Sequence, residues 1–280
     1  MGTEVTFKWL DAFLNGVQFK GKLVAKSGLR VGRGRDFEPM HSDLPLLRLQ
    51  GGAPYLPGSS LKGVLRSSAE ALLRGVAVGA GGTELDAERV ACDIFGKGCT
   101  ELEQTDTDDD KPSSTRAREK RARIEQSTCM VCATFGGKSM ASHLKFRDAH
   151  ALTGKALVTT IRDGVALDRD LGRVAGSAKY DYEVVEPGAV FEFAVDGQNL
   201  EEWQIGLMLA SLAMLDEGMS RVGGFGSRGL GVVGVQESTV VRRTLAEVLA
   251  RTSGTPLNPG DEERCIEALH TQVLRCIERT

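Results

Sequence analysis

PGSSLKG (Pro57–Gly63) opens an apolar helix, and far along the chain SRVGGFGSRGLG (Ser220–Gly231) leads into a strand. Each run places bare backbone N–H groups beside fixed positive charge, which is the combination that a phosphate backbone requires. The first run contains Lys62 and is followed by Arg66, while the second contains two arginines. The two runs together predict a nucleic-acid clamp assembled from distant parts of the chain.

Each run also has an ordinary structural interpretation. Pro-Gly-Ser-Ser is a common helix start with Ser59 or Ser60 as the N-cap, and taken alone it favours that reading. The second run could be a flexible hairpin, but five glycines between Gly223 and Gly231 exceed what a hairpin requires, so backbone approach to a ligand is expected there. Neither run has the glycine spacing of a Walker or dinucleotide-binding loop, so nucleotide cofactors are not expected.

The hydrophobic pattern predicts an α+β fold. Strands are expected over residues 17–31, 46–49, 143–148, 156–161, 189–195 and 229–235. Helices are expected over residues 59–74, 85–95 and 200–214, with a helical tail outside the core over residues 243–251 and 261–279. This order fits a ferredoxin-like or RNA-recognition-motif-like core with insertions. We expect one domain over residues 15–240 and a helical C-terminal extension over residues 241–280.

Composition argues both for and against a nucleic-acid partner. The net charge is −3 and the pI is near 5.9, whereas phosphate binding needs clustered Lys and Arg. Residues 13–75 nevertheless hold ten basic residues against four acidic ones, an excess of six positive charges, although such segregation can be a merely solvated face. No signal-like N-terminal segment and no apolar run of about 18 residues is present. We therefore expect a soluble, cytoplasmic protein without membrane contact.

Four cysteines have the spacing of a metal site. Cys92 and Cys99 form a C-x6-C pair, and Cys129 and Cys132 form a C-x2-C pair, which is the usual half-site for tetrahedral zinc. The pairs bracket a polar insertion, residues 100–128, whose low apolar content predicts mobility. Structural Zn²⁺ would close this insertion (residues 92–132) at both ends. Free buried thiols or a redox pair are the alternatives, and His143 could replace one ligand.

With a middle segment that ends in YDYEVV (Tyr180–Val185), the two runs resemble the repeat-associated (RAMP) proteins of CRISPR systems, most closely the backbone subunit of type III RNA-guided effector complexes. The resemblance covers residues 15–240. It implies a RAMP-like palm domain that holds CRISPR guide RNA, pairs it with complementary target RNA, and contacts other effector subunits and neighbouring copies or paralogues. The RNA contacts predicted on this basis are Arg30, Arg33, Arg35, Gly58, Ser59, Ser60, Lys62, Arg66, Arg221, Gly223, Gly224 and Arg228.

The resemblance also implies RNA cleavage by one aspartate in the loop after the first strand. HSDLPL (His41–Leu46) occupies that place, so Asp43 matches the family position, and Asp36 is the second choice. One carboxylate can hold Mg²⁺ or another divalent cation, or position a 2′-OH for attack, and the arginines that precede the loop could stabilise the phosphorane. A single Asp in a polar loop is otherwise a turn residue.

Residues 159–182 resemble the family's thumb, an extended hairpin that reaches a neighbouring subunit and displaces target nucleotides at regular intervals. The wedge of one subunit and Asp43 of another would then share one scissile site. An ordinary surface hairpin is the alternative. Three functions remain open: a guide-directed endoribonuclease, a non-catalytic architectural subunit of the same complex, and a RAMP endoribonuclease that processes guide precursors.

Overall fold

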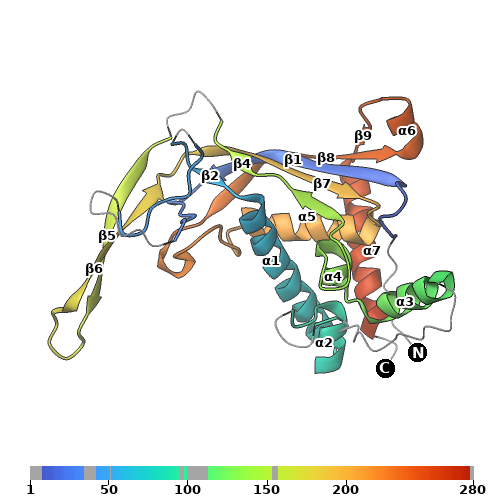
Figure 1. The fold of residues 1–280 in the computed structure, drawn as a ribbon, viewed down its shortest axis with the longest axis horizontal. Coiled ribbons are helices and arrows are strands. Elements are labelled where there is room, and N and C mark those ends of the chain that lie inside the picture. Colours follow the sequence, from blue (N-terminus) through green and yellow to red (C-terminus); the bar gives the residue numbers. More distant parts are fainter. Residues whose placement is uncertain are drawn as a thin grey trace.

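The computed structural model describes residues 8–34, 42–50, 52–94, 98–99, 113–152 and 157–277. An antiparallel sheet has the strand order β3-β7-β1-β8-β9, and α1, α5 and α7 lie along one of its faces (Figure 1). The sheet strands are β1 (Asn15–Ala25), β3 (Leu144–Phe146), β7 (Val190–Gln198), β8 (Val233–Thr244) and β9 (Thr255–Pro256). The other strands are β2 (Tyr55–Leu56), which pairs with β4 (Ala149–His150), and β5 (Thr159–Leu167), which pairs with β6 (Val174–Val185). The helices are α1 (Gly58–Gly79), α2 (Glu84–Val90), α3 (Ser113–Ser127), α4 (Met130–Phe135), α5 (Glu202–Asp216), α6 (Leu245–Leu249) and α7 (Pro259–Ile277), with a 3-10 turn at Gly226–Arg228.

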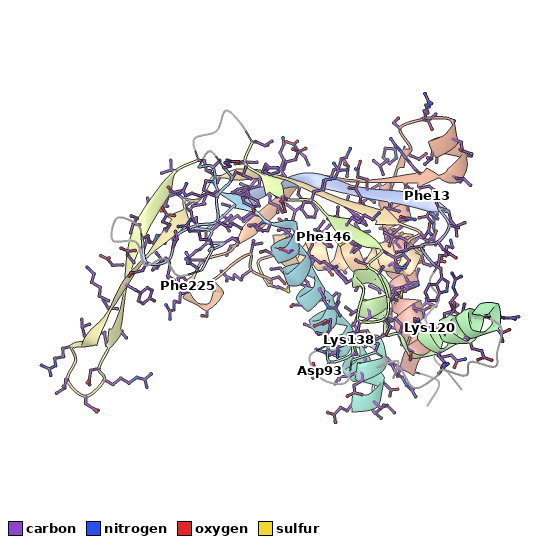
Figure 2. All side chains as sticks on the ribbon, in the orientation of Figure 1. Phe13, Asp93, Lys120, Lys138, Phe146 and Phe225 are labelled. Carbon is purple, nitrogen blue, oxygen red and sulfur yellow. The ribbon has the colours of Figure 1, made fainter. Side chains whose placement is uncertain are left out.

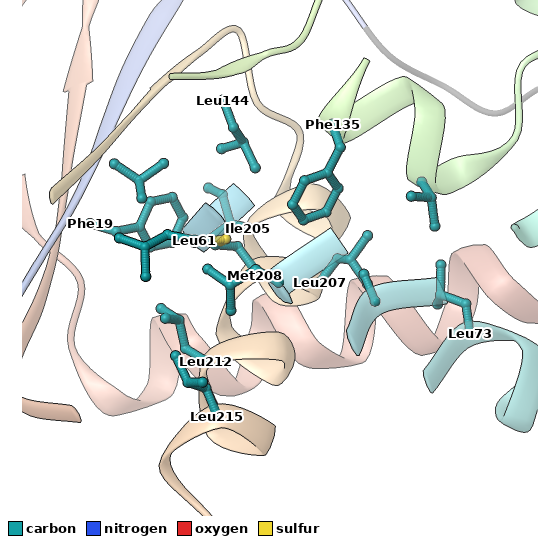
Figure 3. Packing of buried hydrophobic residues seen from close by; sticks show 14 of the residues in the cluster. Phe19, Leu61, Leu73, Phe135, Leu144, Ile205, Leu207, Met208, Leu212 and Leu215 are labelled. Atoms are coloured by element: carbon teal, nitrogen blue, oxygen red, sulfur yellow. The ribbon is translucent and has the colours of Figure 1, made fainter. Parts of the chain in front are cut away.

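The core lies between the sheet and the helices. Alternate residues of β1, such as Phe19 and Leu23, are buried against this layer, as the two-residue period of a half-buried strand requires. α5 supplies Leu207 and Met208, which lie among residues of α1, α4 and the sheet (Figure 3). Because α5 is buried on most of its surface, it fixes the positions of the helices around it.

α5 and α7 approach each other most closely at Gly206. A Cβ added there would lie 2.2 Å from the backbone oxygen of Cys265, which no side-chain movement can relieve. We therefore expect Gly206→Ala to lower the free energy of unfolding by at least about 1–3 kcal/mol, measured by denaturant titration. Gly75→Ala in α1, where an added Cβ meets no atom within 4 Å, is the matched control and is expected to be neutral or stabilising. Equal stability of the two variants would contradict this packing.

Several expected boundaries differ from the structure. α1 has Pro57, not a serine, as its N-cap residue, because the carboxylate of Asp148 accepts the Gly58 N–H (2.7 Å). It continues past residue 74 because Ala77 still packs in the core. Residues 46–49 form isolated bridges instead of a strand. β8 begins four residues later than expected, since Gly229 and Gly231 have φ of 89° and 90° and belong to a loop.

The C-terminal residues are not a tail outside the core. β9 pairs with β8, and α7 buries Cys265, Leu269 and Val273 in the same hydrophobic cluster as the sheet. The amphipathic pattern of α7 is visible in the sequence, but its partner α5 is apolar all round, so the pattern alone does not show where α7 docks.

The basic half of the polar insertion is a helix, so the prediction of a mobile segment was wrong for residues 113–127. α3 buries Ile124 (4% exposed) and pairs with the N-terminal segment: Arg121 contacts Asp11 (2.7 Å) and lies over the ring of Trp9. The Trp9 indole also donates to Glu125. The acidic half, residues 100–112, lies outside the described residues.

The segment that resembles a thumb is a long β5–β6 hairpin that extends away from the body of the molecule (Figure 1). The hairpin exposes large apolar side chains along its length, from Ile161 near its base to Leu167, each 62% exposed, and Leu171 near its tip. A monomer gains nothing from such side chains in water, so this surface is suited to contact with another molecule.

Candidate nucleic-acid interface and metal site

The two runs that suggested a clamp lie side by side. α1 and the glycine-rich run Ser220–Gly231 line one groove of about 550 Å³, and Met214 of α5 also contributes to its lining. The hydroxyls of Ser68 and Ser220 are 2.6 Å apart and join its walls. The helix wall consists of Ser60, Gly63, Val64, Ser67, Ser68 and Ala71, and the opposite wall of Met219, Ser220, Arg221 and Gly223.

Small side chains leave this groove open. Ser60, Gly63 and Ser67 are spaced at helical intervals on one face of α1, and a Cβ built on Gly63 meets no atom within 4 Å. Arg221 is exposed on the opposite wall, and Lys62 precedes Gly63 on the helix. Burial, and then the nearby positive Arg66, lower the pKa of Lys62, which is not among the residues that line the groove. The groove itself therefore combines serine hydroxyls, an unobstructed helix surface at Gly63 and the positive charge of Arg221.

Several glycines that were predicted to contact RNA through their backbone instead contact this chain itself. Gly58 is buried, its N–H donates to Asp148, and a Cβ there would lie 2.5 Å from Phe146 O. Gly223 has φ of 83° and would place a Cβ 2.1 Å from Arg30 O, the same oxygen that accepts the Gly224 N–H (2.8 Å). The expected close approach of glycine backbone is thus real at Gly223 and Gly224, but the atom approached is the protein's own carbonyl.

The predicted arginines divide into two groups. Arg30 (8% exposed) and Arg66 (side chain 14% exposed) are turned inward, whereas Arg33, Arg221 and Arg228 are exposed. Burial lowers the pKa of Arg30; its Nη2 donates to Leu44 O (3.2 Å), and its Nε has no partner among the described residues. Ser59 is exposed at the start of α1. Arg35 and Asp36 lie outside the described residues.

An aromatic cluster joins the glycine-rich run to the hairpin. Phe225 packs edge-on against Tyr182 of β6, with ring centroids 4.9 Å apart, and Figure 2 shows it beside the hairpin. Arg30 and Arg228 each lie about 5 Å from the same ring, and Arg228 donates to the Tyr180 hydroxyl. The run that lines the groove and the base of the hairpin are therefore one packed unit.

Asp43 is held at the base of the hairpin by a reciprocal pair of hydrogen bonds. The Asp43 N–H donates to the Asp181 carboxylate (2.8 Å), and the Asp181 N–H donates to Asp43 Oδ2 (3.1 Å). The Ser42 hydroxyl also donates to Asp181, and the Leu46 N–H donates to Glu183 (2.8 Å). Sequence reasoning missed Asp181 and Glu183 as supports for this loop. Their spacing of two in YDYEVV places both carboxylates on one face of β6, which is the available signal.

The four cysteines form one cluster. All four Sγ atoms lie within 4.8 Å of one another, and those of Cys92 and Cys132 are 3.6 Å apart. Four thiolates around one tetrahedral metal at about 2.3 Å would be separated by about 3.8 Å, so the cluster fits a single metal ion. His143 is not in this group; its Nδ1 contacts Gln198 O (2.8 Å). A cavity of about 330 Å³, lined partly by Cys92, Cys99 and Cys129, opens beside the cluster and offers an entry path.

The thiols of the cluster shift one another's pKa in opposite directions. Hydrogen bonds from the neighbouring thiols lower the pKa of Cys132, and a hydrogen bond with Cys129 lowers that of Cys92 to about 7. Hydrogen bonding with Cys132 raises the pKa of Cys129. All six cysteines of the chain are free. The cluster therefore presents thiolate character to a metal ion, which is what a metal–sulfur bond requires.

Residues 22–233 match the family model of the RAMP superfamily. The chain belongs to this superfamily. The match spans both walls of the groove, Asp43, the hairpin and the cysteine cluster, so none of these features lies outside the family region. A comparison with curated proteins found no match.

Membership of the RAMP superfamily gives the chain a CRISPR-associated RNA-binding role in general terms. Some RAMP proteins are ribonucleases, so the superfamily is compatible with catalysis without establishing it for this chain. Within the described part of the chain, no helix combines the length and the apolar character needed to cross a membrane.

Proposed function

We propose that this RAMP protein is the backbone subunit of a type III CRISPR effector complex, and that it binds guide RNA in the groove between α1 and the glycine-rich run. The observation that carries the proposal is the groove itself, whose walls come from two distant runs with serine hydroxyls, open space beside Gly63 and the Arg221 guanidinium. Phosphates are bound by this set of donors. The proposed partners are guide RNA, complementary target RNA, other effector subunits and neighbouring copies, in the cytoplasm.

A ferredoxin-like palm is the fold that we propose for residues 15–240. In chain order, β1, α1, β3, β7, α5 and β8 follow the β-α-β-β-α-β pattern, and β3-β7-β1-β8 are neighbours in the sheet. The palm carries the insertion of residues 92–132 and the thumb of residues 159–182. The proposed C-terminal extension, residues 241–280, includes the end of β8, α6, β9 and α7, and α7 packs on the palm.

Target cleavage by Asp43 is the second part of the proposal. A carboxylate at this position could orient a ribose 2′-OH, whose attack on the neighbouring phosphorus breaks the bond to the 5′ oxygen and leaves a 2′,3′-cyclic phosphate. Oxygen ligands suit Mg²⁺ or another divalent cation, which when bound would offset charge on the phosphorane. Asp181 fixes the Asp43 backbone, and the exposed hairpin side chains are suited to displacing a nucleotide of the target.

The cysteine cluster is proposed to hold structural Zn²⁺. Four thiols with no open ligand position are typical of a structural site, whereas catalytic zinc keeps one position for water. The ion would tie residues near 92–99 to residues 129–132 across the insertion, where α3 supplies one buried apolar side chain, Ile124.

A negative charge added to the groove tests RNA binding. Gly63→Glu adds a carboxylate where nothing packs, so the fold is retained while guide RNA is repelled, and we expect affinity to fall about tenfold or more. Gly75→Glu carries the same change on the same helix, at a glycine that is also unpacked but does not line the groove. Fluorescence anisotropy with labelled guide RNA measures both variants. Equal RNA affinities of the Gly63→Glu and Gly75→Glu variants would show that guide RNA does not bind in this groove.

The second candidate function is a non-catalytic architectural subunit of the same complex, because the described residues that hold the Asp43 loop also stabilise the fold. Asp181, Ser42 and Glu183 stabilise the loop whether or not it cuts. A guide-processing ribonuclease would instead cleave precursor RNA at one sequence or hairpin without partners. Cleavage assays with guide precursor alone and with the assembled complex separate these functions.

A further inference from the structure

Two arginines of α1 hold the two halves of the cysteine cluster. Arg66 Nη2 lies 3.3 Å from Cys132 Sγ, and its Nη1 donates to Gly136 O (2.7 Å) just after α4. Two turns further along, Arg74 donates from Nε to Ala91 O (3.1 Å) and from Nη2 to Cys92 O (2.9 Å). Arg66 therefore contacts the Cys129–Cys132 half-site, and Arg74 contacts the half-site that contains Cys92.

The charge of a metal–thiolate centre explains the need for these guanidinium groups. Four thiolates around one divalent cation carry a net charge of −2, and Cys92, Cys129 and Cys132 are buried. A buried anionic centre is costly unless positive charge or hydrogen-bond donors surround it. Arg66 supplies both, since its planar fork reaches Cys132, Gly136 and Glu70 at once, the last through Nε to Oε1 (2.8 Å). A lysine could not make these three contacts together.

The adjacent face of the same helix forms the wall of the groove. Ser67, next to Arg66 in the chain, lines the groove together with Gly63 and Ala71. Glu70 pairs with Arg66 and lies between Arg66 and Arg74. A helix whose arginines are anchored to a metal centre presents its neighbouring groove residues in a fixed position.

We infer that Arg66 and Arg74 are outer-sphere residues of a tetrathiolate metal centre, and that through them the metal sets the position of α1 and hence the affinity of the groove for RNA. The second half of this inference rests on the proposed function. It changes the role of Arg66, which sequence reasoning placed among the RNA contacts: the residue supports RNA binding through the metal centre and not by touching phosphate.

The first test measures metal affinity and needs no RNA. The intact chain and its variants are titrated with zinc against a chromophoric chelator, and cobalt(II) loading is followed by thiolate-to-metal charge-transfer absorption. Arg66→Gln and Arg74→Gln are each expected to weaken zinc binding about 10- to 100-fold, as loss of outer-sphere partners does in other metal sites. Arg66→Lys should fall between native and Arg66→Gln because it keeps the charge but loses the fork.

Arg89→Gln is the matched control. Arg89 lines the cavity beside the cluster and pairs with Asp86 (3.1 Å), so its loss removes a nearby positive charge without removing a contact to Cys92 or Cys132. Native zinc affinity is expected in this variant. Native affinity in Arg66→Gln, or equal losses in Arg66→Gln and Arg89→Gln, would overturn the inference.

The second test measures guide-RNA affinity before chelation, after chelation under reducing conditions, and after zinc is returned. Weaker binding after chelation and recovery with zinc is the expected result, and Arg66→Gln should recover near-native RNA affinity only at higher zinc. RNA binding that persists unchanged in the metal-free chain would overturn the inference and leave the proposed function standing. No RNA binding in any state would instead reject the proposed function, while the metal titrations still decide the roles of Arg66 and Arg74.

Discussion

Replacing Asp43 with alanine is expected to abolish target-RNA cleavage while guide and target binding persist. General acid–base or metal-assisted catalysis by one side chain contributes about 10²–10⁴-fold in rate, and Asp43 lies outside the residues that line the groove. The measurement is cleavage of labelled target by the guide-loaded complex, with magnesium and with chelator. The native protein should give a regular ladder of products, and the variant should leave the target intact.

Two further variants separate chemistry from loop structure. Asp43→Asn keeps an oxygen that can accept the Asp181 N–H, and Asp181→Asn keeps an oxygen that can accept the Asp43 N–H and the Ser42 hydroxyl. Asp43→Asn should therefore be inactive and Asp181→Asn largely active. Native cleavage by Asp43→Asn would contradict the assignment, and loss of cleavage on changing Asp36 alone would transfer the role to that residue. Intact target with all proteins, despite tight binding, favours the architectural subunit.

Removal of metal is expected to lower stability more than any single surface substitution. Structural zinc contributes about 10–16 kcal/mol of apparent binding free energy in small zinc-finger peptides, and some of that is expected here because α3 buries one apolar side chain, Ile124. Elemental analysis should find one zinc per chain, and chelation should lower the thermal midpoint. Cys132→Ser should have the same effect as chelation.

Cys265→Ser is the matched control for this prediction, because Cys265 is equally buried but lies in α7, outside the cysteine cluster. The substitution alters packing around α7, yet the metal content of this variant should be native. Protein purified without metal, with a thermal midpoint that chelator does not change, would support free buried thiols instead of a zinc site.

How far the sequence predicts the site depends on whether the signal is local. The groove was predictable because a helix start and a glycine-rich run each carry a local pattern, and the cysteine cluster because C-x2-C aims two thiols at one point. The direction of a long side chain has no such signal. Arg66 follows a predicted phosphate site in the chain, yet its guanidinium reaches Cys132, which is 66 positions away.

Other features depend on partners that are remote in the chain. The polar residues of α3 do not predict a buried face. The helix is held by Asp11 and Trp9, which are too distant in the chain for the local sequence around residue 120 to reveal them. Gly223 looks like a ligand-binding glycine because both uses of glycine, approach to a ligand and approach to a neighbouring strand, need the same missing Cβ. The structure separates them by placing Arg30 O against Gly223.

Ultraviolet cross-linking of the guide-loaded complex, followed by peptide mass spectrometry, shows whether the guide RNA lies in the groove between α1 and the glycine-rich run. We expect cross-links to peptides that contain Gly63–Ser67 of α1 and Ser220–Phe225 of the glycine-rich run. The face of the sheet opposite α1, α5 and α7 (Figure 1), to which the alternation of β1 assigns Lys20 and Lys22, serves as the internal comparison. Cross-links confined to that sheet face, with none in α1 or the glycine-rich run, would contradict the account.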